Sequence, residues 1–208
     1  MARSWQTGQE GYQMANQRVC VYCGSSRQCD PAYLRAAERL GQVLARNNFT
    51  VVYGGGAAGS MRSLADGVLA EGGRVVGVIP EFMIKLEWVN PHIPETIVVG
   101  DMHERKKRML EGADAVIALP GGSGTLEELM EAITWKRLGL YLGAIVILNT
   151  QSYYQPLIRL LDRCIGERFM DSRHAQMWTF VTEPEEVPQA ISAATPWSED
   201  CRDFAALR

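Results

Sequence analysis

Long apolar runs are missing from this sequence, which argues against a chain that crosses a membrane. The best candidate, residues 138–148, is too short to span a bilayer as a helix and contains Gly139 and Gly143. The first seventeen residues are polar and lack the apolar core of a secretory signal. We therefore expect no membrane partner, and a flexible tail at residues 1–17.

An excess of basic charge is missing as well. The chain of 208 residues has 21 Lys and Arg against 24 Asp and Glu, a net charge of −3. Binding to nucleic acid or to a membrane surface through bulk positive charge is therefore not expected. The length is sufficient for one α/β domain with a well-buried core.

Cysteine and histidine are scarce, with five and three residues. An odd cysteine count without disulfide-like spacing favours a reduced, cytoplasmic setting. Cys20 and Cys23 form a C-x-x-C pattern, but in a strand their side chains point to opposite faces, so we expect packing residues. The histidines lack ligand-like spacing, and no metal site is expected: His92, His103 and His174.

Apolar, β-branched segments alternate with helical patterns over residues 18–194. The expected strands are residues 19–22, 50–53, 74–79, 95–99, 115–119, 144–148 and 178–181. The expected helices are residues 31–47, 60–71, 101–111, 124–138, 154–167 and 183–193. This alternation predicts a single doubly wound α/β domain, Rossmann-like, with a mostly parallel sheet and helices on both faces, followed by a C-terminal tail at residues 195–208. Such sheets bind ligands beyond the carboxyl ends of their strands.

A glycine-rich turn joins an expected strand to an expected helix. From Leu119 to Glu128 the sequence is Leu-Pro-Gly-Gly-Ser-Gly-Thr-Leu-Glu-Glu. Glycines let backbone N–H groups approach an anion closely, and a helix start adds positive dipole, so a phosphate fits here. The Gly-Lys-Ser/Thr of a P-loop is absent, which argues against an NTPase.

Glu128 has two interpretations. Thr125-Leu-Glu-Glu128 fits a capping box, which makes Glu128 a structural residue. The glycines that precede the box favour a phosphate at the helix start, which leaves Glu128 free for chemistry. Helical spacing places Glu128 on a partly shielded flank and predicts four apolar residues toward the core, Leu126, Leu129, Met130 and Ile133.

Two other turns follow expected strands. Gly54-x-Gly56-x-x-Gly59 matches the dinucleotide fingerprint, although the acid expected at the end of the next strand is not obvious. Cys23-Gly-Ser-Ser26 places small hydroxyl residues after the first strand. Each turn fits either a ligand contact or ordinary packing. We favour binding of part of a nucleotide by the first and leave the second open.

Basic residues cluster in the segment Asp101-Met-His-Glu-Arg-Lys-Lys-Arg108. Asp101 and Glu104 form a capping box pattern, so the first turn has a structural explanation. The four basic residues fit a solvated face. Two of them on one side of the helix also fit a clamp for a phosphate or a carboxylate.

Met102-His-Glu-Arg-Lys106 together with Pro120-Gly-Gly-Ser-Gly-Thr-Leu-Glu-Glu128 resembles the Lonely Guy family of cytokinin-nucleotide phosphoribohydrolases. The resemblance covers about residues 18–191 and includes Cys23-Gly-Ser-Ser26, Tyr53-Gly-Gly-Gly56 and Tyr153-Tyr154. The chain departs from the family pattern at Ser60, Arg62, Ser123 and Gly143-Ala144.

The resemblance implies a homodimer that cleaves the N-glycosidic bond of an adenosine 5′-monophosphate, N6-modified or plain, without a cofactor. The products are the free base and ribose 5-phosphate. The resemblance implies Arg105 and Glu128 as the catalytic pair. It implies these substrate contacts: Gly24, Ser25, Gly55, Gly56, Glu87, Met102, Lys106, Gly121, Gly122, Ser123, Gly124, Thr125, Leu126, Glu127 and Thr134.

Cleavage of a ribosyl C1′–N bond builds positive charge on the sugar. A preorganised, partly dry carboxylate stabilises that charge. We therefore expect Glu128 to bind ribose hydroxyls and either stabilise C1′ or orient water. Arg105 is expected either to clamp the phosphate and Glu128 or to help the leaving base accept a proton.

Other functions remain open at this point. A non-catalytic nucleotide-binding or carrier protein would use the same loops. A lysine decarboxylase needs a Schiff-base lysine for pyridoxal phosphate, and the four lysines lie in ordinary charged contexts: Lys85, Lys106, Lys107 and Lys136. An NAD-dependent enzyme is the weakest alternative, because the ribose-binding acid is not obvious.

Overall fold

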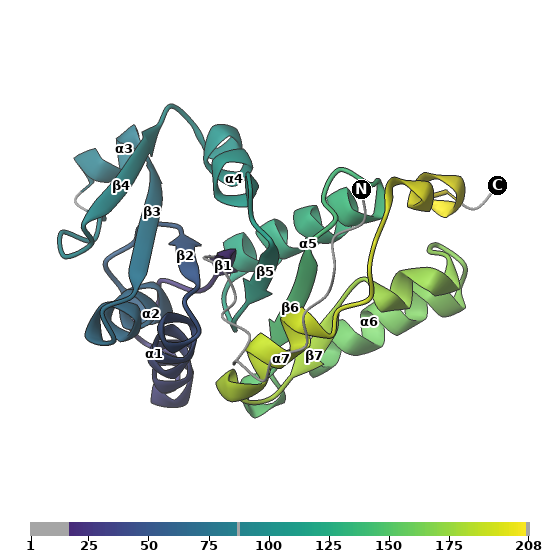
Figure 1. Ribbon diagram of the computed structural model, residues 1–208, viewed down its shortest axis with the longest axis horizontal. Coiled ribbons are helices and arrows are strands. Elements are labelled where there is room, and N and C mark those ends of the chain that lie inside the picture. The colour runs from purple at the N-terminus through teal and green to yellow at the C-terminus, as the bar shows by residue number, and fades with distance from the viewer. Residues whose placement is uncertain (1–16, 87, 207–208) are drawn as a thin grey trace, which may run out of the picture.

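The computed structural model describes residues 17–86 and 88–206, and these form a doubly wound α/β domain. Within them, seven parallel strands are ordered β4-β3-β2-β1-β5-β6-β7 (Figure 1). The predicted fold class is confirmed, and each predicted strand matches within one residue at either end. The strands are β1 Arg18–Tyr22, β2 Thr50–Tyr53, β3 Arg74–Pro80, β4 Glu95–Val99, β5 Ala115–Ala118, β6 Ala144–Leu148 and β7 Thr179–Val181.

Helices follow most strands and cover both faces of the sheet. The α-helices are α1 Pro31–Arg46, α2 Gly59–Ala70, α3 Glu81–Lys85, α4 Met102–Leu110, α5 Ser123–Arg137, α6 Gln155–Gly166 and α7 Val187–Ser192. The 3-10 helices are η1 Thr150–Ser152, η2 Ser172–Gln176, η3 Pro184–Glu186 and η4 Glu199–Phe204. The predicted helix at residues 183–193 is divided into η3 and α7, and α3, η1, η2 and η4 were not predicted.

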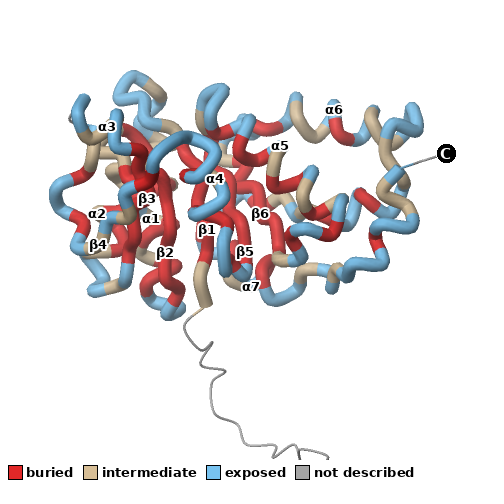
Figure 2. The backbone as a smooth tube through the Cα atoms, turned by 90° about the horizontal axis from the view of Figure 1, so that it is seen from above, coloured by how far each residue is buried: buried red, intermediate tan, exposed pale blue. Residues whose placement is uncertain are grey.

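The central strand β1 is buried on both faces, as the apolar sequence predicts for a parallel sheet. Val19 and Val21 pack in the cluster that contains α1, α2 and α7, whereas Cys20 and Tyr22 pack in the cluster that contains α4 and α5. Figure 2 shows these buried strands in the middle of the molecule, surrounded by exposed turns.

The two cysteines of the C-x-x-C pattern lie on opposite faces of the sheet, as predicted. Cys20 is in one apolar cluster and Cys23 is in the other, and both thiols are free. Burial raises the pKa of both thiols well above the usual range, so they remain neutral. They are packing residues rather than a metal or redox pair.

The strand order reverses at β1, which pairs with β2 on one side and β5 on the other. At the carboxyl ends of these strands Tyr22 is paired with Ala118. The loops that follow therefore meet, and a Cβ on Gly24 would lie 3.3 Å from the Cα of Gly121. This is the switch point at which doubly wound sheets bind ligands.

The segment after residue 194 differs from the predicted tail, because it packs against the end of α5. Trp197 Nε1 donates to the carbonyl of Lys136 at 2.9 Å, and Arg202 Nε donates to that of Leu138 at 3.2 Å. Cys201 is buried, and the ring of Phe204 contacts those of His174 and Trp197. These contacts come from residues distant in sequence, so local periodicity does not reveal them.

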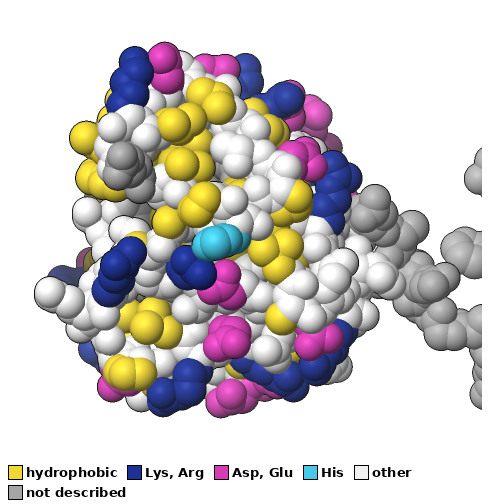
Figure 3. All heavy atoms as spheres, turned by 90° about the vertical axis from the view of Figure 1, so that its left-hand side faces the viewer, with side chains coloured by type: hydrophobic (Ala, Val, Ile, Leu, Met, Phe, Trp, Pro, Cys, Tyr) yellow, Lys and Arg dark blue, Asp and Glu magenta, His cyan; other side chains and the backbone are white. Residues whose placement is uncertain are grey.

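The N-terminal tail predicted at residues 1–17 lies outside the described residues except for Gln17. Within the part of the chain that the structure describes, no helix combines the length and the apolar character needed to cross a bilayer. At the β4 edge of the sheet, apolar side chains gather on the surface (Figure 3). Exposed residues of this end include Phe82, Leu86, Trp88 and Val98.

Candidate active site

Helix α4 starts at a well-formed cap that directs Arg105 inward. Asp101 Oδ1 accepts hydrogen bonds from the backbone N–H groups of His103 and Glu104, each at 2.8 Å. Glu104 Oε2 accepts from the N–H of Gly100 at 2.8 Å. The predicted cap is therefore present, with Glu104 reaching one residue further back than a standard box. Arg105 is 4% exposed, whereas Lys107 is solvated.

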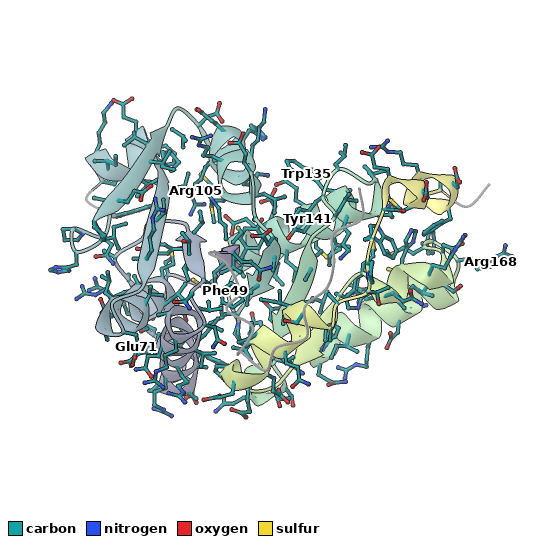
Figure 4. All side chains as sticks on the ribbon, viewed as in Figure 1. Phe49, Glu71, Arg105, Trp135, Tyr141 and Arg168 are labelled. Carbon is teal, nitrogen blue, oxygen red and sulfur yellow. The ribbon has the colours of Figure 1, made fainter. Side chains whose placement is uncertain are left out.

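Arg105, labelled in Figure 4, has hydrogen bonds at each of its three guanidinium nitrogens. Nε donates to the carbonyl of Val78 in β3 at 3.1 Å, and Nη2 donates to the carbonyl of Gly54 after β2 at 3.1 Å. Nη1 donates to Glu128 Oε1 at 3.0 Å, forming a buried ion pair. The backbone of β3 and that of the turn after β2 therefore fix the position of the charge that faces Glu128.

Glu128 lies on the buried face of α5, further inside than the predicted flank. Its neighbours on this face recur at helical spacing: Thr125, Leu129, Ala132, Ile133 and Lys136. Leu126 and Met130, which were predicted to face the core, are 37% and 39% exposed, so that prediction was wrong. Helix α5 therefore presents apolar side chains on two faces.

The capping-box interpretation of Thr125 and Glu128 is also wrong. Helix α5 begins at Ser123, its N-cap is Gly122, and no side chain caps this helix start. Glu128 is one and a half turns inside the helix, where its carboxylate pairs with Arg105.

The environment of Glu128 is dry but charge-compensated. The residue is 6% exposed, and its burial raises the pKa of the carboxyl above the usual range. The positive charge of Arg105 opposes this shift and favours the carboxylate. A buried carboxylate held in one orientation can act strongly on positive charge that develops beside it.

A cavity of about 320 Å³ lies at the switch point. The described residues that line it carry hydroxyl, thiol and backbone groups and include neither lysine nor arginine: Gly24, Ser25, Ser26, Cys29, Tyr33, Ser60, Pro120, Gly121, Gly122 and Tyr153. Helices α2 and α5 both start beside it without a side-chain cap. The N–H of Met61 in α2 donates to the carbonyl of Gly24 at 3.2 Å, and the other N–H groups of the two helix starts, with the helix dipoles, favour an anion.

Four predicted contacts line this cavity, namely Gly24, Ser25, Gly121 and Gly122. The sequence analysis left Ser26 open as a ligand contact and noted Tyr153 and Ser60 only in relation to the family pattern, and it did not identify Cys29 or Tyr33. The shared signal is their place after the carboxyl ends of β1, β2 and β6. Thr125 is buried beneath the turn, where its Oγ1 would lie 2.2 Å from a Cβ added to Gly121.

The glycines at residues 54–59 serve close packing. A Cβ on Gly59, whose φ is +58°, would lie 2.4 Å from the carbonyl oxygen of Ser26. Gly55 accepts a hydrogen bond from the N–H of Asn90 at 2.8 Å, and Gly56 pairs with Val89. The dinucleotide-like spacing is thus explained by packing of α2 and of the segment before β4. A role of Gly55 and Gly56 in substrate binding stays a prediction.

The remaining predicted contacts lie around the ion pair or apart from it. Lys106 Nζ bonds to Glu127 and lies 3.2 Å from Glu131 Oε1, and the bond to Glu127 raises the pKa of Lys106. Met102 and Leu126 are both partly exposed. The chain does not bring Thr134 to the turn: its hydroxyl donates to the carbonyl of Met130 at 2.8 Å, about 16 Å along α5 from Ser123.

Glu87 lies outside the described residues. The next residue, Trp88, accepts a hydrogen bond from the N–H of Ala57 at 3.0 Å. The segment before β4 therefore lies against the glycine turn after β2.

The family profile described as "Possible lysine decarboxylase" matches residues 61–191. The chain is 44% identical over 179 residues to the cytokinin riboside 5′-monophosphate phosphoribohydrolase LOG7 of Arabidopsis thaliana, covering 86% of this chain and 82% of that protein. It is 38% identical over 182 residues to LOG4 of the same plant, which carries the same enzyme name, with 88% and 85% covered.

Solved structures with the same fold include two proteins of molybdenum cofactor handling. The molybdenum cofactor binding protein of Rippkaea orientalis has a TM-score of 0.67 at 23% identity, covering 86% of this chain and 98% of its own. The molybdenum cofactor carrier protein of Chlamydomonas reinhardtii has a TM-score of 0.65 at 20% identity, with 85% and 99% covered. At these identities the likeness establishes the fold alone.

The residues present do not fit pyridoxal phosphate, which a lysine decarboxylase requires. Its Schiff base needs a free amine in the cavity. Lys106 is instead a charged ammonium between two carboxylates, and Lys85 pairs with Glu81 Oε1 at 3.0 Å. Lys107 is solvated and Lys136 is buried near the other end of α5.

The Arg105–Glu128 pair and the glycine turn therefore stand in a chain that shares most of its length with named phosphoribohydrolases. This chain belongs to the Lonely Guy family of cytokinin riboside 5′-monophosphate phosphoribohydrolases.

Proposed function

We propose that this protein hydrolyses the N-glycosidic bond of adenosine 5′-monophosphates, including N6-modified ones, and releases the free base and ribose 5-phosphate. The observation that carries the proposal is the buried ion pair between Arg105 of α4 and Glu128 of α5, because the start of α5 is uncapped and opens at the switch point. The names of the relatives LOG7 and LOG4 support the same reaction.

The 5′-phosphate is held at the start of α5. Ser123, Gly124 and Thr125 offer N–H groups without intrahelical acceptors, and the hydroxyls of Ser25 and Ser60 border the same space. Glu128 lies about 7.5 Å further along the helix axis, a span that a ribose 5-phosphate bridges. The phosphate thereby places C1′ of the ribose beside the carboxylate.

The reaction breaks the C1′–N bond, and its electron pair leaves with the base. Positive charge develops at C1′, and the carboxylate of Glu128 stabilises it. A water molecule then forms the new C1′–O bond, and its proton balances the charge of the departing base. Because Glu128 is buried and oriented before the substrate binds, no reorganisation of solvent around it is needed.

Arg105 positions Glu128 and keeps it ionised. Its three bonds to Val78, Gly54 and Glu128 engage every guanidinium nitrogen inside the protein. Of the two roles left open by the sequence, this geometry favours the clamp on Glu128 over proton delivery to the base.

We also propose that the protein acts as a homodimer in which α5 forms the contact. Leu126, Met130, Thr134 and Leu138 recur every four residues, and all are exposed. The apolar surface continues at Leu140 and Leu142, which border a hollow of about 570 Å³ with the half-buried Trp135. Apolar surface of this extent on a monomer indicates an interface.

The spacing within this stripe supports a role of Thr134 in substrate binding across the proposed dimer. A two-fold axis that passes near Met130, perpendicular to α5, would relate two antiparallel α5 helices. Leu126 and Thr134 are each four residues from Met130, so they would lie opposite each other across the axis. Thr134 would then face the partner subunit's Leu126, close to the phosphate end of that helix. A dimer of this kind supplies Thr134 to the site of the other copy.

We propose a cytoplasmic location for the enzyme. The five cysteines are all free, and three of them are buried, as expected in a reducing compartment.

The deciding experiment measures base release from AMP, N6-isopentenyl AMP and other nucleoside monophosphates by chromatography. Glu128→Gln is the test variant, and Glu167→Gln, an exposed change at the C-terminal cap of α6, is the control. We expect release by the wild type and the control, and a loss of at least about 100-fold in kcat for Glu128→Gln, as for other electrostatic catalysts. Binding of AMP without release by the wild type would instead identify a carrier.

A further inference from the structure

Two consecutive tyrosines in the loop after β6 donate hydrogen bonds to the glycine turn that precedes α5. Tyr153 Oη donates to the carbonyl of Gly121 at 2.5 Å, and Tyr154 Oη donates to the carbonyl of Leu119 at 2.6 Å. Tyr154 is 1% exposed, whereas Tyr153 lines the cavity at the switch point. The two hydroxyls thus bond to carbonyls on either side of Pro120.

The backbone before these tyrosines is strained. Gln151 and Ser152 have φ values of +52° and +58°, in the left-handed region that favours glycine. The strained turn is held by the N–H of Ser152, which donates to the carbonyl of Asn149 at 3.0 Å. Asn149 Oδ1 accepts from the N–H of Tyr154 at 2.6 Å. Strain that the surrounding structure maintains in this way is typical of functional loops.

The hydrogen bond of Tyr153 determines the direction of a peptide group in the turn. The described chain has no cis peptide bond, so the N–H of Gly122 points away from the carbonyl of Gly121. Because Tyr153 holds the carbonyl of Gly121, the N–H of Gly122 points away from Tyr153. The carbonyl oxygen, which would repel an anion, is engaged in the hydrogen bond from the Tyr153 hydroxyl. Gly122 is the N-cap of α5, so this orientation decides what the helix start presents.

The turn is also confined on its other sides. Gly24 approaches Gly121 from the loop after β1, and Thr125 lies beneath it. The ring of Tyr153 packs edge-on against Tyr33 and Tyr154 at centroid distances of 5.8 and 5.0 Å. These ring contacts are independent of the hydroxyl, so Tyr153→Phe removes the hydrogen bond without removing the packing.

We propose that Tyr153 and Tyr154 are positioning residues that hold the carbonyls of Gly121 and Leu119 so that the turn offers N–H groups to the 5′-phosphate. They act through the turn and do not touch the reacting atoms. The identity of the ligand, a phosphate monoester, rests on the proposed function. The two hydrogen bonds from Tyr153 and Tyr154 to the turn, here called the clamp, do not depend on it.

The test compares Tyr153→Phe and Tyr154→Phe with Tyr141→Phe. Tyr141 is a matched control, because it is a buried tyrosine whose Oη also donates to a backbone carbonyl, that of Ala144 at 3.2 Å, at the amino end of β6. Figure 4 shows it apart from Arg105. The readouts are kcat and KM for AMP, calorimetric binding of ribose 5-phosphate and of inorganic phosphate, and the melting temperature.

We expect Tyr153→Phe to raise KM and the Kd for ribose 5-phosphate by about 5- to 10-fold, the effect of one hydrogen bond, while kcat changes less than twofold. Tyr141→Phe should leave these constants unchanged. If Tyr154→Phe lowers the melting temperature strongly, the partly exposed Tyr153 still decides the matter. Unchanged ribose 5-phosphate binding in Tyr153→Phe would overturn the clamp.

Failure of the clamp and failure of the proposed function give different results. If the wild type releases no base but Tyr153→Phe still weakens ribose 5-phosphate binding, the clamp stands and the hydrolase assignment fails. If base release is robust and the phosphate constants of Tyr153→Phe equal those of Tyr141→Phe, the hydrolase stands and the clamp fails. Absence of both base release and ribose 5-phosphate binding in the wild type overturns both.

Discussion

A Cβ on Gly54 would lie 1.9 Å from Nη2 of Arg105. The guanidinium cannot shift without breaking hydrogen bonds, because its nitrogens are bonded to Val78, Gly54 and Glu128. We therefore expect Gly54→Ala to displace the Arg105 side chain and to lower kcat by about 100-fold, as misplacement by an ångström does. Gly166→Ala, where a Cβ meets no atom within 4 Å, is the control. Equal kcat in the two variants would contradict this role of Gly54.

The dry environment of Glu128 should appear in the pH profile. Burial raises the pKa of its carboxyl, so the carboxylate is lost, as pH falls, at a higher pH than for an ordinary glutamate. The rate of base release should therefore be maximal above that raised pKa and should decline as the pH falls through it. Phosphate monoesters also titrate at about 6, so binding of ribose 5-phosphate measured over the same range separates the two effects. An acid limb at the usual glutamate pKa would refute the prediction.

One charge added to the exposed stripe of α5, around Met130, should prevent formation of the proposed dimer. Met130→Glu places a carboxylate where the proposed two-fold axis passes, so it should convert a dimer to a monomer in light scattering. Activity should fall with it, because Thr134 no longer reaches the other copy. Leu160→Glu makes a similar change on α6, where Leu160 is 57% exposed, and should alter neither property. A wild type that is already monomeric would remove the basis for the dimer.

Titration of Lys136 should change the free energy of unfolding at alkaline pH. The residue is 1% exposed, its Nζ donates to the carbonyl of Gly143 at 2.6 Å, and burial lowers its pKa from 10.5 to about 8. Between these values the unfolded chain binds a proton that the folded chain has released, so stability rises with pH in this window. The shift corresponds to about 3 kcal/mol.

The stability of the wild type is compared with that of Lys136→Met, a variant that keeps an apolar side chain of similar length and has no titrating group. Urea unfolding of both proteins at neutral pH and near 10 should show the wild type gaining stability relative to the variant. A constant difference between the two proteins at both pH values would show that Lys136 does not titrate in this range.

The sheet could be predicted closely because its signals are local. Strands such as β1, β5 and β6 are short apolar runs flanked by glycine, proline and polar residues, and a parallel sheet buries both of their faces. Helix α3 was missed because five residues contain no helical repeat. Helix η4 was missed because the groups that hold it, among them the carbonyl of Lys136, are more than sixty residues away in sequence.

The candidate site was predictable where residue type and spacing carry the chemistry. The glycine turn was identified in this way, whereas the pairing of Arg105 with Glu128 was implied by the family resemblance, and the structure shows these two side chains hydrogen-bonded. The orientation of Leu126 and Met130 was not predictable, because in a helix that is apolar on two faces the sequence does not show which face packs inside. The hydrogen bonds of Tyr153 and Tyr154 depend on a strained backbone that has no signal in the sequence.

The described lining of the switch-point cavity has hydroxyls and backbone groups but neither lysine nor arginine. A phosphate bound there would be recognised by fixed neutral dipoles rather than by mobile opposite charges. Its affinity should therefore respond weakly to added salt, because screening acts mainly on exposed charges. The same arrangement gives little electrostatic steering from a distance, so substrate capture would be limited by geometric fit and not by long-range attraction.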